Sequence, residues 1–559
     1  MIWRFRLVLF LLLFSLFVVI IRLFYWQVVK AQELYLLGQS QYGKDIKIVP
    51  QRGDIMTSDG FPIVTNKISY LLFANPKEVK DTSATIQTLK QILDIDEASA
   101  SAQLKRDRFW VPLKKDLTAE EKKNIEKLSL SGIGFEKQYK RFYPEASMSA
   151  HLVGFVGKDE NGDDKGYFGL EGFYDRLLKG KEGRAVQIHD AVGRPILAEA
   201  SSDTKAINGS GLKLNIDRSV QFMLEEKLKE GLDRYGASRV SAAILEPVSG
   251  NVIAMATFPS FDPQSYQEYS EDLFKDPFIS SLYEPGSTFK PLVMSAAIDK
   301  ELVKPETKCP ICVGPYSIGG YEIHTWNDKY YKDINMIGVI QHSDNVGMVY
   351  VAEKLGVDRM VDYLEKFGIG DLTGIDLQGE TAHPLPPKNI WYPVDLATKG
   401  FGQGITLTPM ELLNAFSTIA NDGIRMEPHV VSEIVTPEGK KIKIEPKELG
   451  RPISETTAKV MTEILVNAVK KGEASWAAPK GYRIAGKTGT ASIPIKGHYD
   501  PNQTIASFIG FAPADNPRFS MLVIVDRPTT SIYGAETAAP IFFRIARNLL
   551  SYYGIPPAE

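Results

Sequence analysis

The stretch EPGSTFKP, Glu284–Pro291, precedes an apolar run rich in leucine and alanine. The proline-glycine pair predicts a turn, and the apolar run predicts a buried helix that Ser287 opens. At a helix N-terminus, unpaired backbone N–H groups and the helix dipole favour negative charge. Lys290 follows three residues later and therefore lies on the same helical face. A buried lysine has a lowered pKa, so this pattern predicts a serine nucleophile with a lysine base.

This Ser-x-x-Lys motif is weak by itself, because chance and helix-surface pairing produce it often. Two further motifs follow in the chain, Ser343-Asp344-Asn345 and then Lys487–Thr490, which reads KTGT. The order Ser-x-x-Lys, Ser-x-Asn, Lys-Thr-Gly is the signature of serine acyl-transferases that react with penicillin. We therefore expect the three motifs to meet in one active site.

On these motifs the chain resembles the class B penicillin-binding proteins, which are peptidoglycan D,D-transpeptidases, and the resemblance covers nearly the whole chain. The segments Ala485–Ala491 and Phe508–Ala514 resemble the division-type (septal) enzymes more than the elongation-type enzymes. The resemblance implies an α+β fold and a role in cell wall synthesis, and it implies no cofactor and no metal.

The resemblance also implies a mechanism. Ser287 attacks the D-Ala–D-Ala carbonyl of a stem peptide, Lys290 takes its proton, and D-Ala leaves. The amine of a neighbouring stem peptide then attacks the ester and forms the crosslink. Ser343 and Lys487 relay the proton to the leaving amine, and Asn345 holds the substrate amide.

Three residues are expected to bind substrate. The resemblance implies that Thr488 and Thr490 hold the terminal carboxylate, and that the backbone N–H groups of Ser287 and Thr490 form the oxyanion hole. Gly489 is expected to let the substrate backbone approach the strand closely.

The first 30 residues predict a membrane anchor. Leu7–Ile21 is almost wholly apolar, two arginines precede it, and Tyr25 and Trp26 are placed as interfacial aromatics. No small-x-small cleavage site follows, so a retained anchor is favoured over a cleaved signal peptide. We expect a single-pass protein of the bacterial inner (plasma) membrane, with its N-terminus in the cytoplasm and its catalytic domain outside.

With 559 residues, the chain is long enough for an anchor and two or three domains. We expect an N-terminal pedestal (dimerisation-type) domain over 31–200, a polar linker over 201–211, and a transpeptidase domain over 212–559 with a central antiparallel sheet flanked by helices. Within the pedestal we expect Arg52, Arg141 and Glu171 to form a buried ionic cluster with a structural role.

Local patterns predict several elements of this fold. Asp59-Gly60 predicts a hairpin turn, and Asp217 an N-terminal helix cap. The strands are expected over 240–245, 252–256, 505–512 and 519–525, and a closing helix over 538–550. The glycine spacing over 400–409 is not a dinucleotide fingerprint. The resemblance implies instead that this segment is a tight loop beside the catalytic helices.

The composition limits the other possibilities. The net charge of −3 does not point to nucleic acid. Cys309 and Cys312 are the only two cysteines, and we favour a local disulfide or two free thiols in a surface loop over a redox pair or half of a zinc site. The expected partners are peptidoglycan stem peptides on lipid-linked or nascent glycan strands, β-lactams as inhibitors, a membrane glycan polymerase, and other divisome or elongasome proteins.

Two other functions stay open. A D,D-carboxypeptidase or β-lactamase would hydrolyse the acyl-enzyme, and the glutamate that resembles a deacylating base most closely is Glu411. It lies in an apolar helical run and is expected to be a solvated helix residue. A catalytically silent penicillin-binding scaffold is disfavoured, because such a site has no physical need to keep all three motifs.

Overall fold

The computed structural model describes residues 2–34, 37, 43–188, 201–495 and 498–557. The chain begins with helix α1 (Ile2–Phe24), which continues as a π-helical turn over Tyr25–Val29. This 28-residue helix has a mean hydropathy of 3.0, and none of its most apolar window is buried within the chain. A bilayer core is about 30 Å thick, so a helix of this length and composition can cross a membrane once. The Arg22 guanidinium lies 5.8 Å from the Trp26 ring centre, at the predicted interfacial end.

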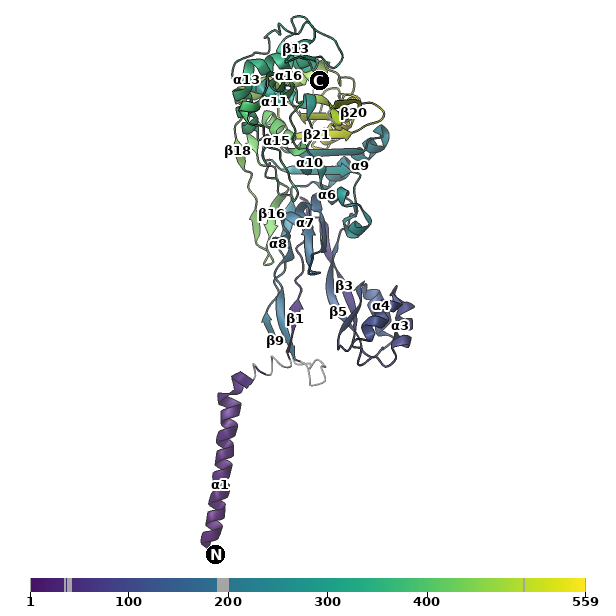
Figure 1. The fold of residues 1–559 in the computed structure, drawn as a ribbon, viewed down its shortest axis with the longest axis vertical. Helices are drawn as coiled ribbons and strands as arrows, with labels where there is room; N and C mark the ends of the chain where they lie inside the picture. The colour runs from purple at the N-terminus through teal and green to yellow at the C-terminus, as the bar shows by residue number, and fades with distance from the viewer. Residues whose placement is uncertain (1, 35–36, 38–42, 189–200, 496–497, 558–559) are drawn as a thin grey trace. The chain divides into compact units, whose positions relative to one another are not determined.

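The chain divides into two compact units (Figure 1). The smaller unit comprises Met1–Arg52, Asn66–Lys140 and Lys179–Gly209, and the larger comprises Gly53–Thr65, Arg141–Leu178 and Ser210–Glu559. The chain therefore enters the larger unit twice before residue 210. The domain boundaries expected at 200 and 211 stay predictions.

The smaller unit is built from two groups of strands. Strand β8 (Gly183–Ile188) pairs antiparallel with β1 (Gly43–Ile48) and with β9 (Ser201–Thr204). Within this unit, β3 (Pro62–Ala74) pairs with β4 (Val111–Leu117) and with β5 (Ile133–Phe142). Their apolar side chains share a core with helices α3 (Thr82–Lys90), α4 (Glu97–Leu104) and α5 (Ala119–Glu126). Each of these helices has a side-chain N-terminal cap, so the local sequence defines where it begins.

In the larger unit, short segments from the first half of the chain pair with late ones. Strand β2 (Ile55–Met56) pairs in parallel with β10 (Gly211–Leu214), which pairs antiparallel with β16 (Val431–Val435) and through it with β17 (Lys441–Lys443). The predicted hairpin turn is confirmed, since β2 and the start of β3 pair around Gly60, whose φ is +85°. Beside them lie the hairpin β6 (Phe155–Lys158) and β7 (Asp164–Tyr167) and the short helices α6 (Ala150–Val153), α7 (Gly169–Phe173) and α8 (Asp175–Lys179).

One ion pair of the predicted cluster is present in the larger unit. Arg141 Nε donates to Glu171 Oε1 at 2.6 Å, and both side chains are almost fully buried, 6% and 0% exposed. Arg52 is also buried but belongs to the smaller unit. A buried ion pair that loses one partner leaves an uncompensated charge, so we still expect a structural role for Arg141 and Glu171.

The main sheet of the larger unit has five antiparallel strands in the order β12-β11-β21-β20-β19. They are β11 (Arg239–Leu245), β12 (Val252–Phe258), β19 (Ala485–Ile495), β20 (His498–Ala512) and β21 (Phe519–Asp526). Strand β21 is buried along nearly its whole length, because helices cover both faces of the sheet. The predicted central antiparallel sheet flanked by helices is confirmed.

Successive residues of each strand point into two different cores. In β11, Val240 and Ala242 pack with α9 (Arg218–Tyr235) and α17 (Ala538–Tyr552), whereas Ala243 packs in the opposite core. This alternation follows from the two-residue period of a strand. The opposite core contains α11 (Lys290–Asp299), α13 (Asn345–Phe367), α15 (Pro409–Ala420) and α16 (Glu455–Lys471). In Figure 1 the yellow strands β20 and β21 lie next to the green helix α15. At this contact the ring centres of Phe416 and Phe511 are 5.9 Å apart.

Local signals define the ends of several of these helices. The Asp217 carboxylate caps α9 by accepting from the backbone N–H groups of Ser219 and Val220, as predicted. Gly236 ends the same helix with a φ of +55°, a backbone conformation that glycine adopts at little cost.

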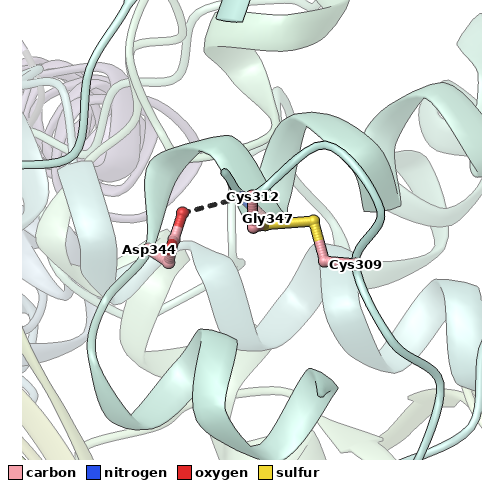
Figure 2. Close-up of a disulfide and its surroundings, with 4 residues drawn as sticks. All are labelled: Cys309, Cys312, Asp344 and Gly347. Atoms are coloured by element: carbon pink, nitrogen blue, oxygen red, sulfur yellow. Dashed lines mark hydrogen bonds between the residues drawn. A yellow bond between two sulfur atoms is a disulfide. The ribbon is translucent and has the colours of Figure 1, made fainter. Parts of the chain in front are cut away.

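The two cysteines form a disulfide that is buried (Figure 2). Of the two alternatives left open, a disulfide or two free thiols, the disulfide is the one present. Cys309 and Cys312 are 1% and 0% exposed and belong to the main core, so the predicted surface position is wrong. The reason is tertiary, because the Cys309 N–H donates to Ile334 O and ties the loop to the start of α12 (Met336–Gln341). Both sulfurs are used in this bond, so they do not provide thiolate ligands for zinc.

Candidate active site

Ser287 lies in a tight turn that leads directly into a buried helix. Gly286–Thr288 forms one 3₁₀ turn, and α11 begins at Lys290. Ser287 therefore precedes the α-helix by one turn instead of opening it. The cause is local: Gly286 has a φ of +57°, and the Thr288 hydroxyl donates to Pro285 O at 2.7 Å.

The loop over 400–404 supports this turn from outside. The Gly286 N–H donates to Gly402 O at 3.0 Å. A β-carbon at Gly402 would lie 2.2 Å from Gly286 O, so only glycine permits this approach. The prediction that this loop lies beside the catalytic elements is confirmed.

Lys290 is completely buried, and its amine is held by the second motif. Its Nζ donates to Ser343 O at 2.6 Å, to Asn345 Oδ1 at 2.8 Å and to Ser343 Oγ at 3.2 Å. The Ser343 hydroxyl in turn donates to Ser287 Oγ at 2.9 Å. The hydrogen-bonded path between the nucleophile and the lysine therefore passes through Ser343.

The second motif occupies the junction between two helices. It lies between α12 and α13, where Ser343 adopts a φ of +55°, a strained value for a residue with a side chain. Asp344 caps α13 by accepting from the Gly347 N–H at 2.8 Å, as Figure 2 shows. Asn345 Nδ2 donates to His324 O at 2.9 Å, so the orientation of its amide is set by contacts on both sides. The motif thus begins a helix and at the same time aims two side chains at Lys290.

The third motif lies on edge strand β19, next to the nucleophile turn. Lys487 is 3% exposed, and its Nζ donates to Thr488 Oγ1 at 3.0 Å and to Thr488 O at 3.2 Å. The Thr488 hydroxyl donates to Glu473 Oε2 at 3.1 Å. The Thr490 hydroxyl accepts from the Gly534 N–H at 3.0 Å, which leaves its own proton available.

Gly489 is required by packing within the protein. A β-carbon there would lie 2.4 Å from Ser507 Oγ and 2.8 Å from Thr288 Cγ2. The glycine therefore lets β19 approach the nucleophile turn.

The two buried lysines influence each other. Burial lowers the pKa of Lys290 well below its usual range, and the nearby Lys487 cation lowers this pKa further, whereas the Asp344 and Glu473 carboxylates raise it. Burial also lowers the pKa of Lys487, and Glu473 opposes that shift. A neutral amine at Lys290 can accept a proton, so the electrostatics favour it as the base.

Glu411 is not the solvated residue that its helical context suggested. It is 2% exposed and forms a capping box with Thr408 at the start of α15. Its second oxygen accepts from the Gly370 N–H at 3.0 Å. The prediction is wrong because the spacing Thr408-x-x-Glu411 is that of a capping box, which turns the glutamate back onto the first backbone N–H groups of the helix. Both carboxylate oxygens hold backbone N–H groups, which is a structural role.

Sequence reasoning also missed Glu473. It follows the glycine that ends α16 and lies 14 residues before Lys487 in the chain. No short motif marks a residue at such a separation, and only the packing of α16 against β19 brings it to the site.

The three predicted motifs are therefore brought together. Ser287 is hydrogen-bonded to Ser343, Ser343 to Lys290, and a second buried lysine lies on the adjacent strand. A serine hydroxyl in contact with a potential base, beside buried cationic groups, is the arrangement that activates serine for covalent acyl transfer. Fold and site together define a serine acyl-transferase.

Comparison with known proteins agrees with this class. Residues 240–547 match the family "Penicillin binding protein transpeptidase domain", and residues 47–214 match "Penicillin-binding Protein dimerisation domain". The chain therefore belongs to the class B penicillin-binding proteins, in the division-type subgroup.

Curated relatives resemble the chain over almost its full length. It is 33% identical over 561 residues to stage V sporulation protein D of Bacillus subtilis, which covers 99% of this chain and 86% of the relative. It is 30% identical over 571 residues to the peptidoglycan D,D-transpeptidase FtsI of Escherichia coli K12, covering 99% and 92%.

Solved structures share the fold. A peptidoglycan synthetase from Bifidobacterium adolescentis has a TM-score of 0.75 at 27% identity, covering 92% of this chain and 98% of that one. Penicillin-binding protein 3 of Mycobacterium tuberculosis, complexed with aztreonam, has a TM-score of 0.72 at 27% identity, covering 92% and 98%.

Proposed function

We propose that this chain is a membrane-anchored peptidoglycan D,D-transpeptidase that crosslinks stem peptides during cell division. The observation that carries the proposal is the Ser343 hydroxyl, which donates to Ser287 Oγ and accepts from Lys290 Nζ. Relatives named peptidoglycan D,D-transpeptidase support the reaction, and the similarity to FtsI supports the division role.

In the acylation step, Ser287 Oγ attacks the carbonyl carbon between the two D-Ala residues. The Oγ–C bond forms, the C–N bond breaks, and the serine proton passes to Lys290, either directly or through Ser343. The same groups, with Lys487, return a proton to the departing D-Ala amine. Because burial and the Lys487 cation lower the pKa of Lys290, more of its amine is neutral and able to act as the base than in an exposed lysine.

The developing oxyanion is assigned to the backbone N–H groups of Ser287 and Thr490. Each such donor contributes roughly 2.7–4 kcal/mol to the transition state in related acyl transfers. The terminal carboxylate of the substrate is assigned to the Thr488 and Thr490 hydroxyls. Thr490 is the more direct donor, because the Thr488 proton is already donated to Glu473. Asn345 and Gly489 stay assigned to the substrate backbone.

In the second step, the amine of a neighbouring stem peptide attacks the ester carbonyl. A new C–N bond forms, the C–Oγ bond breaks, and the proton from the amine restores the Ser287 hydroxyl. Glu411, the nearest sequence candidate for a water-activating base, holds backbone N–H groups at the start of α15. This favours transfer over the alternatives of a D,D-carboxypeptidase or a β-lactamase.

The α1 helix anchors the protein in the membrane by a single pass. We assign its N-terminus to the cytoplasm and both compact units to the outer side, because Arg4 and Arg6 precede the apolar segment. The proposed partners are glycan strands with stem peptides, a glycan polymerase and other division proteins. The related structures with aztreonam and ampicillin support β-lactams as inhibitors.

The test is the intact mass of the full-length, detergent-solubilised protein after incubation with a penicillin, followed by peptide mapping. We expect a stable adduct on Ser287 and none in Ser287→Ala. Stem-peptide substrates then distinguish crosslinked dimers from simple loss of D-Ala. Rapid loss of the penicillin without an adduct would identify a hydrolase, and neither adduct nor loss would favour the silent scaffold.

A further inference from the structure

A small cavity adjoins the third motif on the side of α16. It is lined by Glu473, Lys487 and Thr488 together with apolar side chains that include Val469 and Phe508. The volume open to the centre of a water-sized sphere is about 10 Å³. This is close to the minimum space that one water molecule needs, and a water also needs polar partners. Two charged residues, Glu473 and Lys487, border this cavity.

Glu473, which lines this cavity, has an unsatisfied carboxylate oxygen. Its Oε2 accepts from the Thr488 hydroxyl at 3.1 Å. Its Oε1 is buried and has no hydrogen-bond partner among the residues that the structure describes. A buried carboxylate oxygen without a partner costs free energy, so a hydrogen-bond donor in the cavity would stabilise this oxygen.

Glu473 is connected to Lys487 by a continuous path. Lys487 Nζ donates to Thr488 Oγ1 at 3.0 Å, and this hydroxyl donates to Glu473. The amine donates to the hydroxyl and the hydroxyl donates to the carboxylate, so one hydroxyl connects the negative charge of Glu473 to the Lys487 amine. A bridging water is a favourable second connection in such an arrangement.

We propose that Glu473 is a positioning residue for Lys487, acting through the Thr488 hydroxyl and through one water molecule held between Glu473 Oε1 and Lys487 Nζ. The carboxylate keeps Lys487 charged although the amine is buried. The Lys487 cation in turn lowers the pKa of Lys290. Among the described residues, Glu473 is the carboxylate that raises the pKa of Lys487, whereas its effect on the pKa of Lys290 is smaller than those of burial, the Lys487 cation and Asp344, so it acts mainly on Lys487. This inference rests on the proposed acyl-transfer function.

The charged groups around the two amines support this assignment. Lys290 projects from α11, Asp344 caps α13, and Glu473 follows α16. Burial and the Lys487 cation lower the pKa of Lys290, whereas Asp344 and Glu473 raise it, in that order of size. Burial raises the pKa of the Asp344 carboxyl, and the neighbouring His342 acts in the opposite direction. Glu473 is the acidic group that raises the pKa of Lys487.

The expected effect on catalysis is a shift in pH dependence. Acylation requires a charged Lys487, so its rate falls when the pH rises through the pKa of that lysine. Glu473→Gln removes the charge that raises this pKa while keeping the shape of the side chain. We therefore expect the alkaline limb of the acylation profile to move to lower pH by about one unit. Glu473→Asp keeps the charge, so its alkaline limb should lie closer to that of the original protein than the limb of Glu473→Gln does.

The experiment measures the second-order rate of acylation by a chromogenic β-lactam on the full-length solubilised protein across the pH range. Glu463→Gln is the matched control, because Glu463 is an exposed carboxylate on α16, the helix that Glu473 follows, and pairs with Arg483. It should leave the profile unchanged. An alkaline limb of Glu473→Gln that coincides with that of the unchanged protein would overturn the proposal. So would an equal loss of rate at every pH, which indicates a purely structural role.

Two outcomes separate this inference from the proposed function. If the unchanged protein forms no adduct on Ser287, the proposed function fails. If it does form the adduct and Glu473→Gln shows the same pH profile, only the inference fails. A high-resolution crystal structure provides a second measurement: a water within hydrogen-bond distance of Glu473 Oε1 and Lys487 Nζ supports the bridge, and an empty cavity contradicts it.

Discussion

The Lys290 amine lies 2.6 Å from the backbone carbonyl oxygen of Ser343, and also contacts the hydroxyl of the same residue at 3.2 Å. This double contact holds the second motif against the base through both its main chain and its side chain. It also explains how Ser343 stays at a φ of +55°, since the surrounding contacts determine a conformation that is unfavourable by itself.

The first prediction concerns the Ser343 hydroxyl. In Ser343→Ala, Ser287 loses its hydrogen bond, while Lys290 keeps the Ser343 carbonyl and Asn345 as acceptors. Because positioned proton transfer contributes 10²–10⁴-fold, we expect acylation by a penicillin to slow by about that factor. Stopped-flow acylation kinetics test this, with thermal unfolding as the control. Acylation within threefold of the original rate would show that Lys290 activates Ser287 without the bridge.

The second prediction concerns Gly489. A methyl group in Gly489→Ala would lie within 3 Å of Ser507 Oγ and Thr288 Cγ2, so β19 must move away from the nucleophile turn. We expect acylation to fall more than tenfold, together with a loss of about 1–3 kcal/mol in the free energy of unfolding. Gly314→Ala is the matched control, because its β-carbon meets no atom within 4 Å. Equal behaviour of the two variants would contradict the packing argument.

The third prediction follows from the lowered pKa of Lys290. The unfolded chain has the ordinary lysine pKa of 10.5, so between the lowered pKa and 10.5 the unfolded state binds more protons than the folded state. Stability therefore rises with pH across this window, and the full penalty for the buried amine is present below it.

Lys290→Met removes this titration with an apolar side chain of similar length. We expect the difference in unfolding free energy between the original protein and the variant to shift in favour of the original protein as the pH rises through the window. Denaturant unfolding at several pH values measures it. A pH-independent difference would mean that the folded-state pKa of Lys290 is not lowered.

The fourth prediction concerns the disulfide. Its loop closes only four residues, and for a loop of this size the chain-entropy model gives about 2 kcal/mol. The double variant Cys309→Ala/Cys312→Ala should therefore lose about 2 kcal/mol of unfolding free energy. Equilibrium unfolding in denaturant, without reductant, tests it. A loss several times larger would indicate that the bond orders α12, to which the Cys309 N–H ties the loop.

Several features could be predicted from the sequence because their causes are local. The apolar length of α1, the Asp217 cap and the turn at Gly60 depend on residues within a few positions of one another. The meeting of the three motifs in one place is also as predicted. Each motif carries its own chemistry, and their order in the chain is distinctive. The capping role of Glu411 is also predictable from the sequence, because its partner Thr408 lies only three residues away.

The remaining features depend on contacts between distant segments. The burial of the disulfide depends on α12. Residue 489 must be a glycine because Thr288 and Ser507 leave no room for a β-carbon there. The link between Glu473 and Lys487 exists only because α16 packs on β19.

By itself, the sequence determined the anchor, the order of elements and the chemical groups of the site. The tertiary structure alone decided which lysine contacts which serine and which carboxylate lies near which amine. The physical reason is that pKa values and hydrogen bonds depend on distance and burial, and these are set by packing between residues far apart in the chain.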